Sequence, residues 1–210
     1  MRELVIVGAG GFARETAAAA TAAGWRVLGF LDDDPALPGT TRSGLPILGP
    51  VDQETTAAVV VCVGNPRNYT ARQRIVAQLG LPAERYATVV HPAAVVGSGC
   101  VVGPGSVLLA GTVLTADVTV GSHVAVMPQA VLTHDDRVDD FATVASGVRL
   151  GGGAVLERGA YVGAGALVRE GVTVGAWSLV GMGSVVLHDV PAGEVWAGNP
   201  ARLIRPLTRS

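Results

Sequence analysis

The sequence predicts an α/β domain of the nucleotide-binding kind followed by a three-sided parallel β-helix. The first 88 residues alternate apolar strand-like runs with helical segments, and an aliphatic residue then recurs every six positions for about a hundred residues. Glycine, at 29 of 210 residues, is about twice as common as usual, which favours a backbone with many tight turns. The expected parts are 1–88 for the α/β domain, 89–195 for the β-helix and 196–210 for a C-terminal tail.

The α/β domain is expected to be a small parallel sheet, because strands and helices alternate at short spacing. The expected strands are residues 3–7, 25–30 and 57–64, and the expected helices are residues 12–23 and from about Pro66 to Gly80. The Pro- and Gly-rich stretch 35–50 is predicted to be a loop. The glutamate at position 3 favours a first strand over a targeting sequence at the start of the chain.

The turn after the first strand carries a dinucleotide-type motif. The letters GAGGFA at residues 8–13 formally match G-x-G-x-x-G/A, and Asp32 follows the second strand. A domain of under 90 residues is about half the size of a full dinucleotide-binding fold. An NAD-binding function of this domain stays open as an alternative, and so does a reading in which the glycines serve only the turn.

The second part of the chain follows a strict six-residue frame. The aliphatic positions are Val96, Val102, Leu108, Leu114, Val120, Val126, Leu132, Val138, Val144, Leu150, Leu156, Val162, Val168, Val174, Val180 and Val186. This period suits neither a helix nor a simple strand, but it suits a coil with one short strand on each of three sides and 18 residues per circuit. We expect about five coils, with each aliphatic side chain facing inward and its burial stabilising the fold by roughly 1.5–3 kcal/mol.

Composition excludes several classes of partner. A net charge of −2 gives no sign of a nucleic-acid groove or of binding to an anionic membrane surface. Every apolar stretch of 18 residues is interrupted by Gly or polar residues, so no transmembrane helix is expected. The two cysteines, Cys62 and Cys100, lie in apolar contexts that fit a reducing compartment. We therefore expect a cytoplasmic protein.

One charged segment, THDDRVDD at residues 133–140, interrupts the apolar repeat. In the six-residue frame His134 and Asp135 fall on outward and corner positions, with Gly152 one circuit later. A histidine in this place can accept a proton, a carboxylate can orient its ring, and a glycine N–H can bind an oxyanion. Asp136 falls on an inward position, where an ionised carboxylate needs a partner; Arg137 and Arg149 are the expected candidates.

An α/β domain, hexapeptide repeats and the closing segment VWAGNPAR at residues 195–202 together resemble the left-handed β-helix sugar acyltransferases. The most similar group is the NeuD/PglD-like one, which acetylates sialic acid or UDP-linked 4-amino sugars. The resemblance implies a left-handed coil, acetyl-CoA as acyl donor, no metal, and a nucleotide-linked or sialic-acid-like sugar as N- or O-acyl acceptor. It further implies a homotrimer with active sites between neighbouring subunits.

The resemblance also implies roles for particular residues. His134 is the general base and Asp135 its partner. The oxyanion and CoA would be bound by Gly152, Ala164, Met182 and Arg202. The acceptor would be bound by Gly10, Gly11, Phe12, Asp32, Asp33, Gly64 and Asn65, with Arg72 as a candidate phosphate partner.

Several positions depart from the family pattern. Met127 stands where an asparagine is common, Thr143 where a second histidine is expected, and Phe12 where some relatives carry histidine. A catalytically lapsed sugar-nucleotide-binding or scaffold protein therefore stays open as an alternative. His123 falls on an outward position of its hexad and is predicted to be a surface residue.

Overall fold

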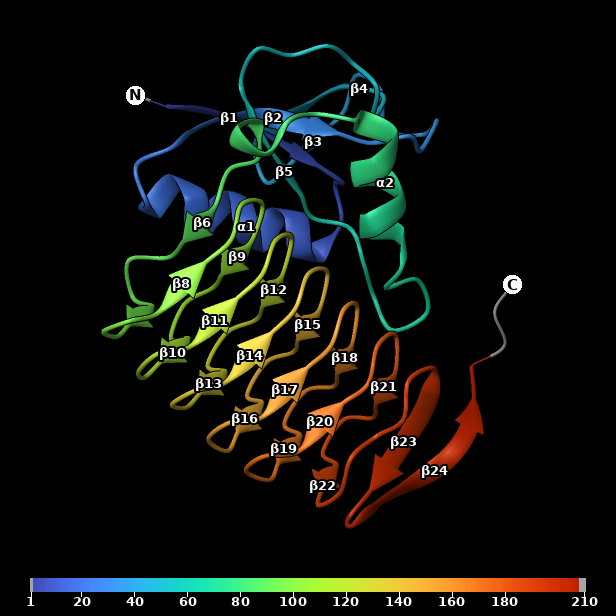
Figure 1. Ribbon diagram of the computed structural model, residues 1–210. Helices are drawn as coiled ribbons and strands as arrows, with labels where there is room; N and C mark the ends of the chain where they lie inside the picture. The colour runs from blue at the N-terminus through green and yellow to red at the C-terminus, as the bar shows by residue number, and fades with distance from the viewer. Residues whose placement is uncertain (1, 208–210) are drawn as a thin grey trace.

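The computed structural model describes residues 2–207, in which an α/β domain lies on one side of a β-helix (Figure 1). The sheet of the α/β domain has the strand order β3-β4-β2-β1-β5. Its strands are β1 (Glu3–Val7), β2 (Arg26–Leu31), β3 (Thr41–Arg42), β4 (Leu45–Gly49) and β5 (Ala58–Val61), and its helices are α1 (Gly11–Ala22), α2 (Ala71–Leu79) and a 3₁₀ turn (Ala83–Arg85). All pairs are parallel except β3–β4. No helix within residues 2–207 has the length and apolar character needed to cross a membrane.

The two helices cover opposite faces of this sheet. Side chains of α1 pack against one face together with Val89 and Val107 of the β-helix, so α1 forms the layer between the two parts. The side chains of Ile75 and Val76 on α2 pack against the other face. The small Ala side chains of α1 let the sheet and the β-helix approach it closely from both sides.

Two predictions about the α/β domain were wrong. The predicted loop 35–50 contains the β3–β4 hairpin, because Ser43 and Gly44 both take positive φ (48° and 78°) and form a two-residue turn. The second helix begins at Ala71 and not near Pro66. The Asn65 side chain accepts the backbone N–H of Arg67, which forms a local turn that competes with the helix.

The β-helix has three faces built from two-residue strands. The first face holds β7 (Val95–Val96), β10 (Val113–Leu114), β13 (Val131–Leu132), β16 (Arg149–Leu150), β19 (Leu167–Val168) and β22 (Val185–Val186). The second face holds β8 (Val101–Val102), β11 (Thr119–Val120), β14 (Arg137–Val138), β17 (Val155–Leu156) and β20 (Thr173–Val174). The third face holds β6 (Val89–Val90), β9 (Val107–Leu108), β12 (Ala125–Val126), β15 (Thr143–Val144), β18 (Tyr161–Val162) and β21 (Leu179–Val180), extended by the hairpin of β23 (Glu194–Gly198) and β24 (Ala201–Pro206).

The predicted circuit of 18 residues is confirmed. Val113 pairs in parallel with Val131, and Val131 with Arg149, and the same offset holds on all three faces. In Figure 1 the strands of the second face rise to the right while successive coils descend to the right, so the coil is left-handed. Because each coil contributes three strands, β6 to β22 make five coils and part of a sixth.

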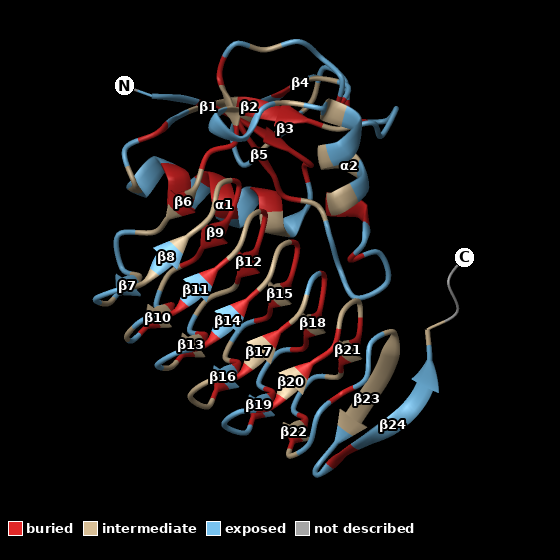
Figure 2. Cartoon of the chain, in the orientation of Figure 1, coloured by how far each residue is buried: buried red, intermediate tan, exposed pale blue. Residues whose placement is uncertain are grey.

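The inward aliphatic ladder forms the core of the β-helix. From Leu108 to Val186 every ladder side chain is at most 4% exposed, and the buried residues run in rows along the prism in Figure 2. Val96 is 42% exposed, because the first coil has no preceding coil to cover its first face. The predicted ladder is therefore confirmed, with fraying only at its open end.

The corners between faces use a residue with positive φ once in each hexad. Glycine fills most of these positions, but five successive corners from 117 to 141 carry other residues with φ between 54° and 64°. They are Asp117, His123, Gln129, Asp135 and Phe141. Left-handed conformations cost a residue with a Cβ roughly 1–2 kcal/mol each, and such strain is often retained at functional sites. The strained corners surround the charged segment.

Candidate active site

His134 and Asp135 lie at the corner between the first and second faces, directly after β13. The His134 Nδ1 atom is 2.8 Å from Asp135 Oδ2, and both side chains are about 70% exposed (70% and 68%). With Nδ1–H donating to the carboxylate, the lone pair of Nε2 is free to accept a proton. The hydrogen bond and the charge of Asp135 raise the pKa of His134. The pair therefore has the geometry of an oriented general base.

Gly152 lies beside the His134 ring, one coil later. A Cβ placed on Gly152 would come within 2.4 Å of Cε1 and 2.5 Å of Nε2, so the ring can lie where it does only over a glycine. Backbone N–H groups at the same turn position donate to carboxylates elsewhere: Ser122 to Asp140, and Ala176 to Glu157, both at 2.8 Å. The N–H of Gly152 is therefore placed to donate to an oxyanion near Nε2.

Asp136 is 1% exposed, as its inward position predicts, but its expected arginine partners were wrong. Its carboxylate accepts the backbone N–H of Thr133 at 2.7 Å and of Ala154, one coil later, at 2.8 Å. Ser106 accepts the N–H of Val124 in the same way, which identifies this as a polar link between coils. Burial raises the pKa of Asp136 to about 6 although both hydrogen bonds oppose the rise.

A pocket of about 230 Å³ lies between the α/β domain and the third face. Phe12 and Gly64 reach it from the α/β domain and Ala164 from the β-helix, so three predicted binding residues come together there. Met127 and Thr143, the other two departures from the family pattern, line the same pocket. Tyr161 and Arg72 complete a wall that the six-residue frame marks only as outward-facing.

The remaining predicted acceptor residues are distributed around the first turn. A Cβ on Gly10 or Gly11 would have no neighbour within 4 Å, so open space adjoins the N-terminus of α1. Asp32 accepts the backbone N–H of Ala9 at 2.8 Å, and Asp33 accepts that of Val51 at 2.8 Å. Both aspartates therefore organise loops at this edge of the sheet, as does Asn65 in its local turn.

The predicted donor residues lie on two separate corners. Ala164 and, one coil later, Met182 lie on the corner between the third and first faces, and the Met182 side chain is 81% exposed. Arg202 lies on β24, where its guanidinium donates to the carbonyl of Ala201. Gly152 lies on the His134 corner instead. One chain thus leaves the two groups of donor residues apart.

His123 is a correction to the sequence prediction of a surface residue. It is 6% exposed, with its ring stacked on Phe141 at 5.1 Å and met edge-on by Tyr86 at 4.6 Å. Burial, and then the nearby Arg72 cation, lower the pKa of His123 to about 4. The outward position is covered because the α/β domain packs over this corner through Tyr86, which the repeat alone does not reveal.

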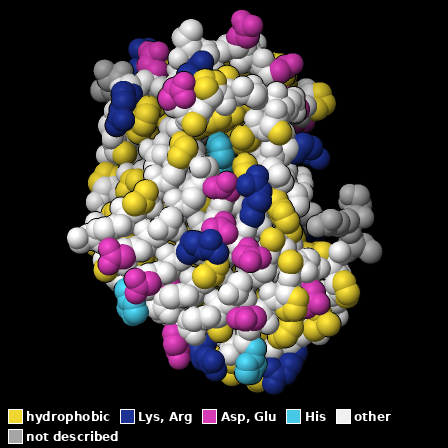
Figure 3. All heavy atoms as spheres, in the orientation of Figure 1, with side chains coloured by type: hydrophobic (Ala, Val, Ile, Leu, Met, Phe, Trp, Pro, Cys, Tyr) yellow, Lys and Arg dark blue, Asp and Glu magenta, His cyan; other side chains and the backbone are white. Residues whose placement is uncertain are grey.

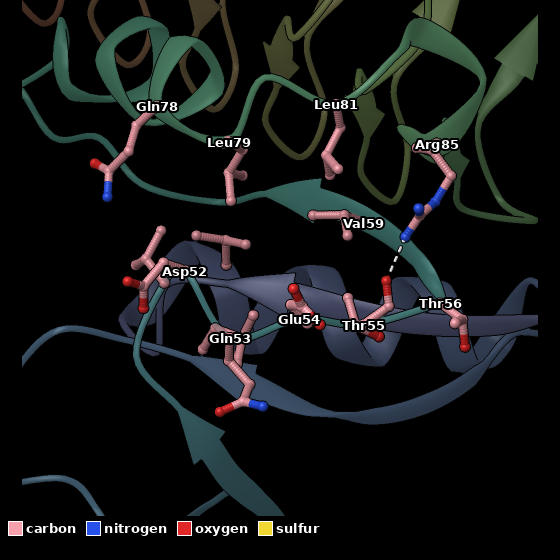
Figure 4. Close-up of a pocket in the computed structure, with 13 residues that line it drawn as sticks. Asp52, Gln53, Glu54, Thr55, Thr56, Val59, Gln78, Leu79, Leu81 and Arg85 are labelled. Atoms are coloured by element: carbon pink, nitrogen blue, oxygen red, sulfur yellow. Dashed lines mark hydrogen bonds between the residues drawn. The ribbon is translucent and has the colours of Figure 1, made fainter.

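A larger cavity of about 820 Å³ lies inside the α/β domain, on the α2 side of the sheet (Figure 4). Val59, Leu79 and Leu81 form its apolar wall, and Arg85 donates across its end to the carbonyl of Thr55 at 2.6 Å. None of the predicted site residues lines it. Size therefore does not identify the site, and the smaller pocket carries the relevant chemistry.

A three-sided β-helix with an oriented exterior histidine, joined to a nucleotide-binding-type domain, defines the class of β-helix acyltransferases. The PglD N-terminal domain family matches residues 3–79. The acetyltransferase domain of PglB from Neisseria gonorrhoeae is 31% identical, with 97% of this chain and 100% of that chain covered and a TM-score of 0.87. The same domain in complex with acetyl coenzyme A is 30% identical over 97% and 99% of the two chains, with a TM-score of 0.85.

Two further solved structures are similar over nearly the whole chain. A histidine-to-asparagine variant of perosamine N-acetyltransferase from Caulobacter crescentus, in complex with CoA and GDP-perosamine, is 28% identical over 97% of both chains, with a TM-score of 0.87. WeeI from Acinetobacter baumannii is 27% identical over 97% of this chain and 100% of that chain, with a TM-score of 0.84. No curated protein sequence matches. The chain belongs to the PglB/PglD-like family of sugar acetyltransferases.

Proposed function

We propose that this acetyltransferase moves the acetyl group of acetyl-CoA to an amine or hydroxyl of a nucleotide-linked amino sugar or sialic-acid-like sugar, with His134 as the general base. The observation that carries this proposal is the placement of His134, oriented by Asp135 at 2.8 Å and lying over the side-chain-free face of Gly152. The relative captured with CoA and GDP-perosamine supports the sugar-nucleotide class of the acceptor.

The chemistry follows from these three residues. Nε2 of His134 takes a proton from the acceptor nitrogen or oxygen as that atom attacks the thioester carbonyl carbon. The oxyanion that forms accepts the N–H of Gly152. When the tetrahedral intermediate collapses, the C–S bond breaks and the imidazolium returns its proton to the leaving CoA sulfur. Asp135 stabilises the imidazolium between these steps.

Direct attack on the bound thioester is favoured over an acyl-enzyme. Cys62 is buried in the α/β domain, and its burial raises the thiol pKa to about 12, which disfavours the nucleophilic thiolate. Cys100 lies two coils before His134, roughly 10 Å along the prism. Neither thiol can therefore use His134 as its base.

The position of the pocket supports a site shared between subunits. His134 lies at the corner between the first and second faces, which is the corner opposite the third face, where the pocket lies. A second copy can bring its His134 to the pocket of the first. The outward positions of the first face are mostly aliphatic, with Val95 56% and Leu167 47% exposed, whereas the second face carries interspersed acidic and basic side chains (Figure 3). We propose a homotrimer with the first face in the interface.

The test is thiol release from acetyl-CoA across UDP-, dTDP- and GDP-linked amino sugars and free sialic-acid-type sugars, with product mass as the second readout. Acetylation of one acceptor, lost in His134→Ala, supports the proposal. Background release across all acceptors would favour the lapsed binding protein. An NADH fluorescence titration in parallel tests the NAD alternative, and light scattering tests the trimer.

A further inference from the structure

Arg72 is a buried cation at the junction of the two parts of the protein. It lies near the start of α2 and is 2% exposed. Its Nη2 donates to the carbonyls of Phe141 and Ala142, at 2.8 and 3.0 Å, and to the hydroxyl of Thr143 at 3.0 Å. Within residues 2–207 no carboxylate lies within ion-pair distance of it. Burial lowers the pKa of Arg72 to about 10, so the side chain stays cationic at neutral pH.

This cation is not fully used by the protein. Nε of Arg72 is buried and has no hydrogen-bond partner within the described chain. Arg72 also lines the 230 Å³ pocket, together with Phe12 and Gly64. A Cβ on Gly64 would come to 3.6 Å from Nη1, so a larger side chain on this loop would crowd the guanidinium. Buried donors are nearly always paired, and a buried charge without a counter-ion is suited to an incoming anion.

A second positive end faces the same region. α1 has twelve residues, its N-cap Gly10 offers no side-chain cap, and its first turn holds no acidic residue. The free N–H groups and dipole of such a helix end favour an anion. Phe12, in the first turn of α1, lines the pocket with Arg72. The helix N-terminus and the guanidinium can therefore act on one bound anion from two sides.

We propose that Arg72 binds a phosphate oxygen of the sugar-nucleotide acceptor. This inference rests on the proposed function and names the residue that selects a nucleoside-diphosphate group for it. The same guanidinium fastens the β-helix corner at Phe141–Thr143 to the α/β domain, so acceptor binding also strengthens the docking of the two parts. CoA also carries phosphates, and the experiment separates the two sources.

Calorimetric titration with UDP, dTDP, GDP and CoA is the experiment, on wild type, Arg72→Gln, Arg72→Lys and the control Thr143→Val. At least one nucleoside diphosphate binds the wild type and raises its Tm. Arg72→Gln raises the Kd for that nucleotide about 10-fold or more, the scale of one charged hydrogen bond, and leaves the Kd for CoA unchanged. Thr143→Val removes one partner of Arg72 without its charge, and leaves the nucleotide Kd within about twofold.

Each other outcome is decisive. A folded Arg72→Gln variant with wild-type nucleotide affinity overturns the inference. If Arg72→Gln fails to fold, Arg72→Lys decides, because it keeps the charge but lacks the fork of donors: unchanged affinity overturns the inference, and weaker affinity supports it. A selective loss of CoA binding assigns the phosphate to CoA and overturns it. Acetyl transfer without nucleotide binding overturns only this inference, whereas the absence of both overturns the proposed function.

Discussion

Substitution of Gly152 by alanine tests the candidate site without altering a charged group. The added Cβ would lie 2.4 Å from Cε1 of His134, and an ordinary contact needs at least 3.4 Å, so the ring must move by about 1 Å. Gly152 does not have a positive φ, so the backbone accepts alanine without strain. Because the ring is exposed, it can move away at little cost in stability. A displacement of about 1 Å at a general base costs on the order of 10²-fold in rate.

The assay is acetyl transfer under saturating acetyl-CoA, with Tm measured in parallel. We expect kcat of Gly152→Ala to fall about 10²-fold while Tm changes by less than about 2 °C. Ala176→Gly is the matched control, because Ala176 occupies the same turn position on a different corner, and its kcat should stay at the wild-type value. A Gly152→Ala enzyme with wild-type kcat would refute the placement of His134 against Gly152 during the reaction.

Three further outcomes are expected. Asp135→Asn lowers the pKa of His134, so the acid limb of the kcat–pH profile moves to lower pH, and an unmoved limb would contradict this orientation. Asp136→Asn loses about 1–3 kcal/mol of unfolding free energy in urea at pH 7, because its amide can accept only one of the two backbone N–H groups; unchanged stability with lost kcat would make Asp136 the working acid. His123 has its pKa lowered to about 4 by folding, so the unfolded chain binds its proton first and stability falls as pH drops from about 6.5 to about 4. His123→Phe should flatten that fall in urea titrations, and an equally steep fall would place its cause elsewhere.

The β-helix could be predicted from sequence because its period is a direct consequence of its geometry. One inward aliphatic residue per face and three faces per coil leave an 18-residue pairing, which Val113 and Val131 show. The corner positions were less visible. Asp135 and Phe141 stand where neighbouring hexads use glycine, and this departure signals strain near the site, although it was not used as a predictor.

The parts that could not be predicted depend on contacts between distant segments. His123 and Thr143 are outward in the repeat, and only the docking of the α/β domain buries the first and places the second beside Arg72. The partner of Asp136 could not be found in the sequence either, because it is the backbone of the next coil. By contrast, the His134–Asp135 pair is adjacent in sequence and follows from the six-residue frame.

The central claim is that His134 removes the acceptor proton, and single-turnover acetyl transfer by His134→Ala tests it most directly. The acceptor is the one that the acetylation assays identify, and CoA affinity and Tm are measured on the same preparation. We predict a rate lower by about 10²–10⁴-fold, the range of one positioned acid–base group, with CoA affinity and Tm unchanged. A His134→Ala enzyme that keeps the wild-type rate would show that the charged segment is structural and would contradict the account.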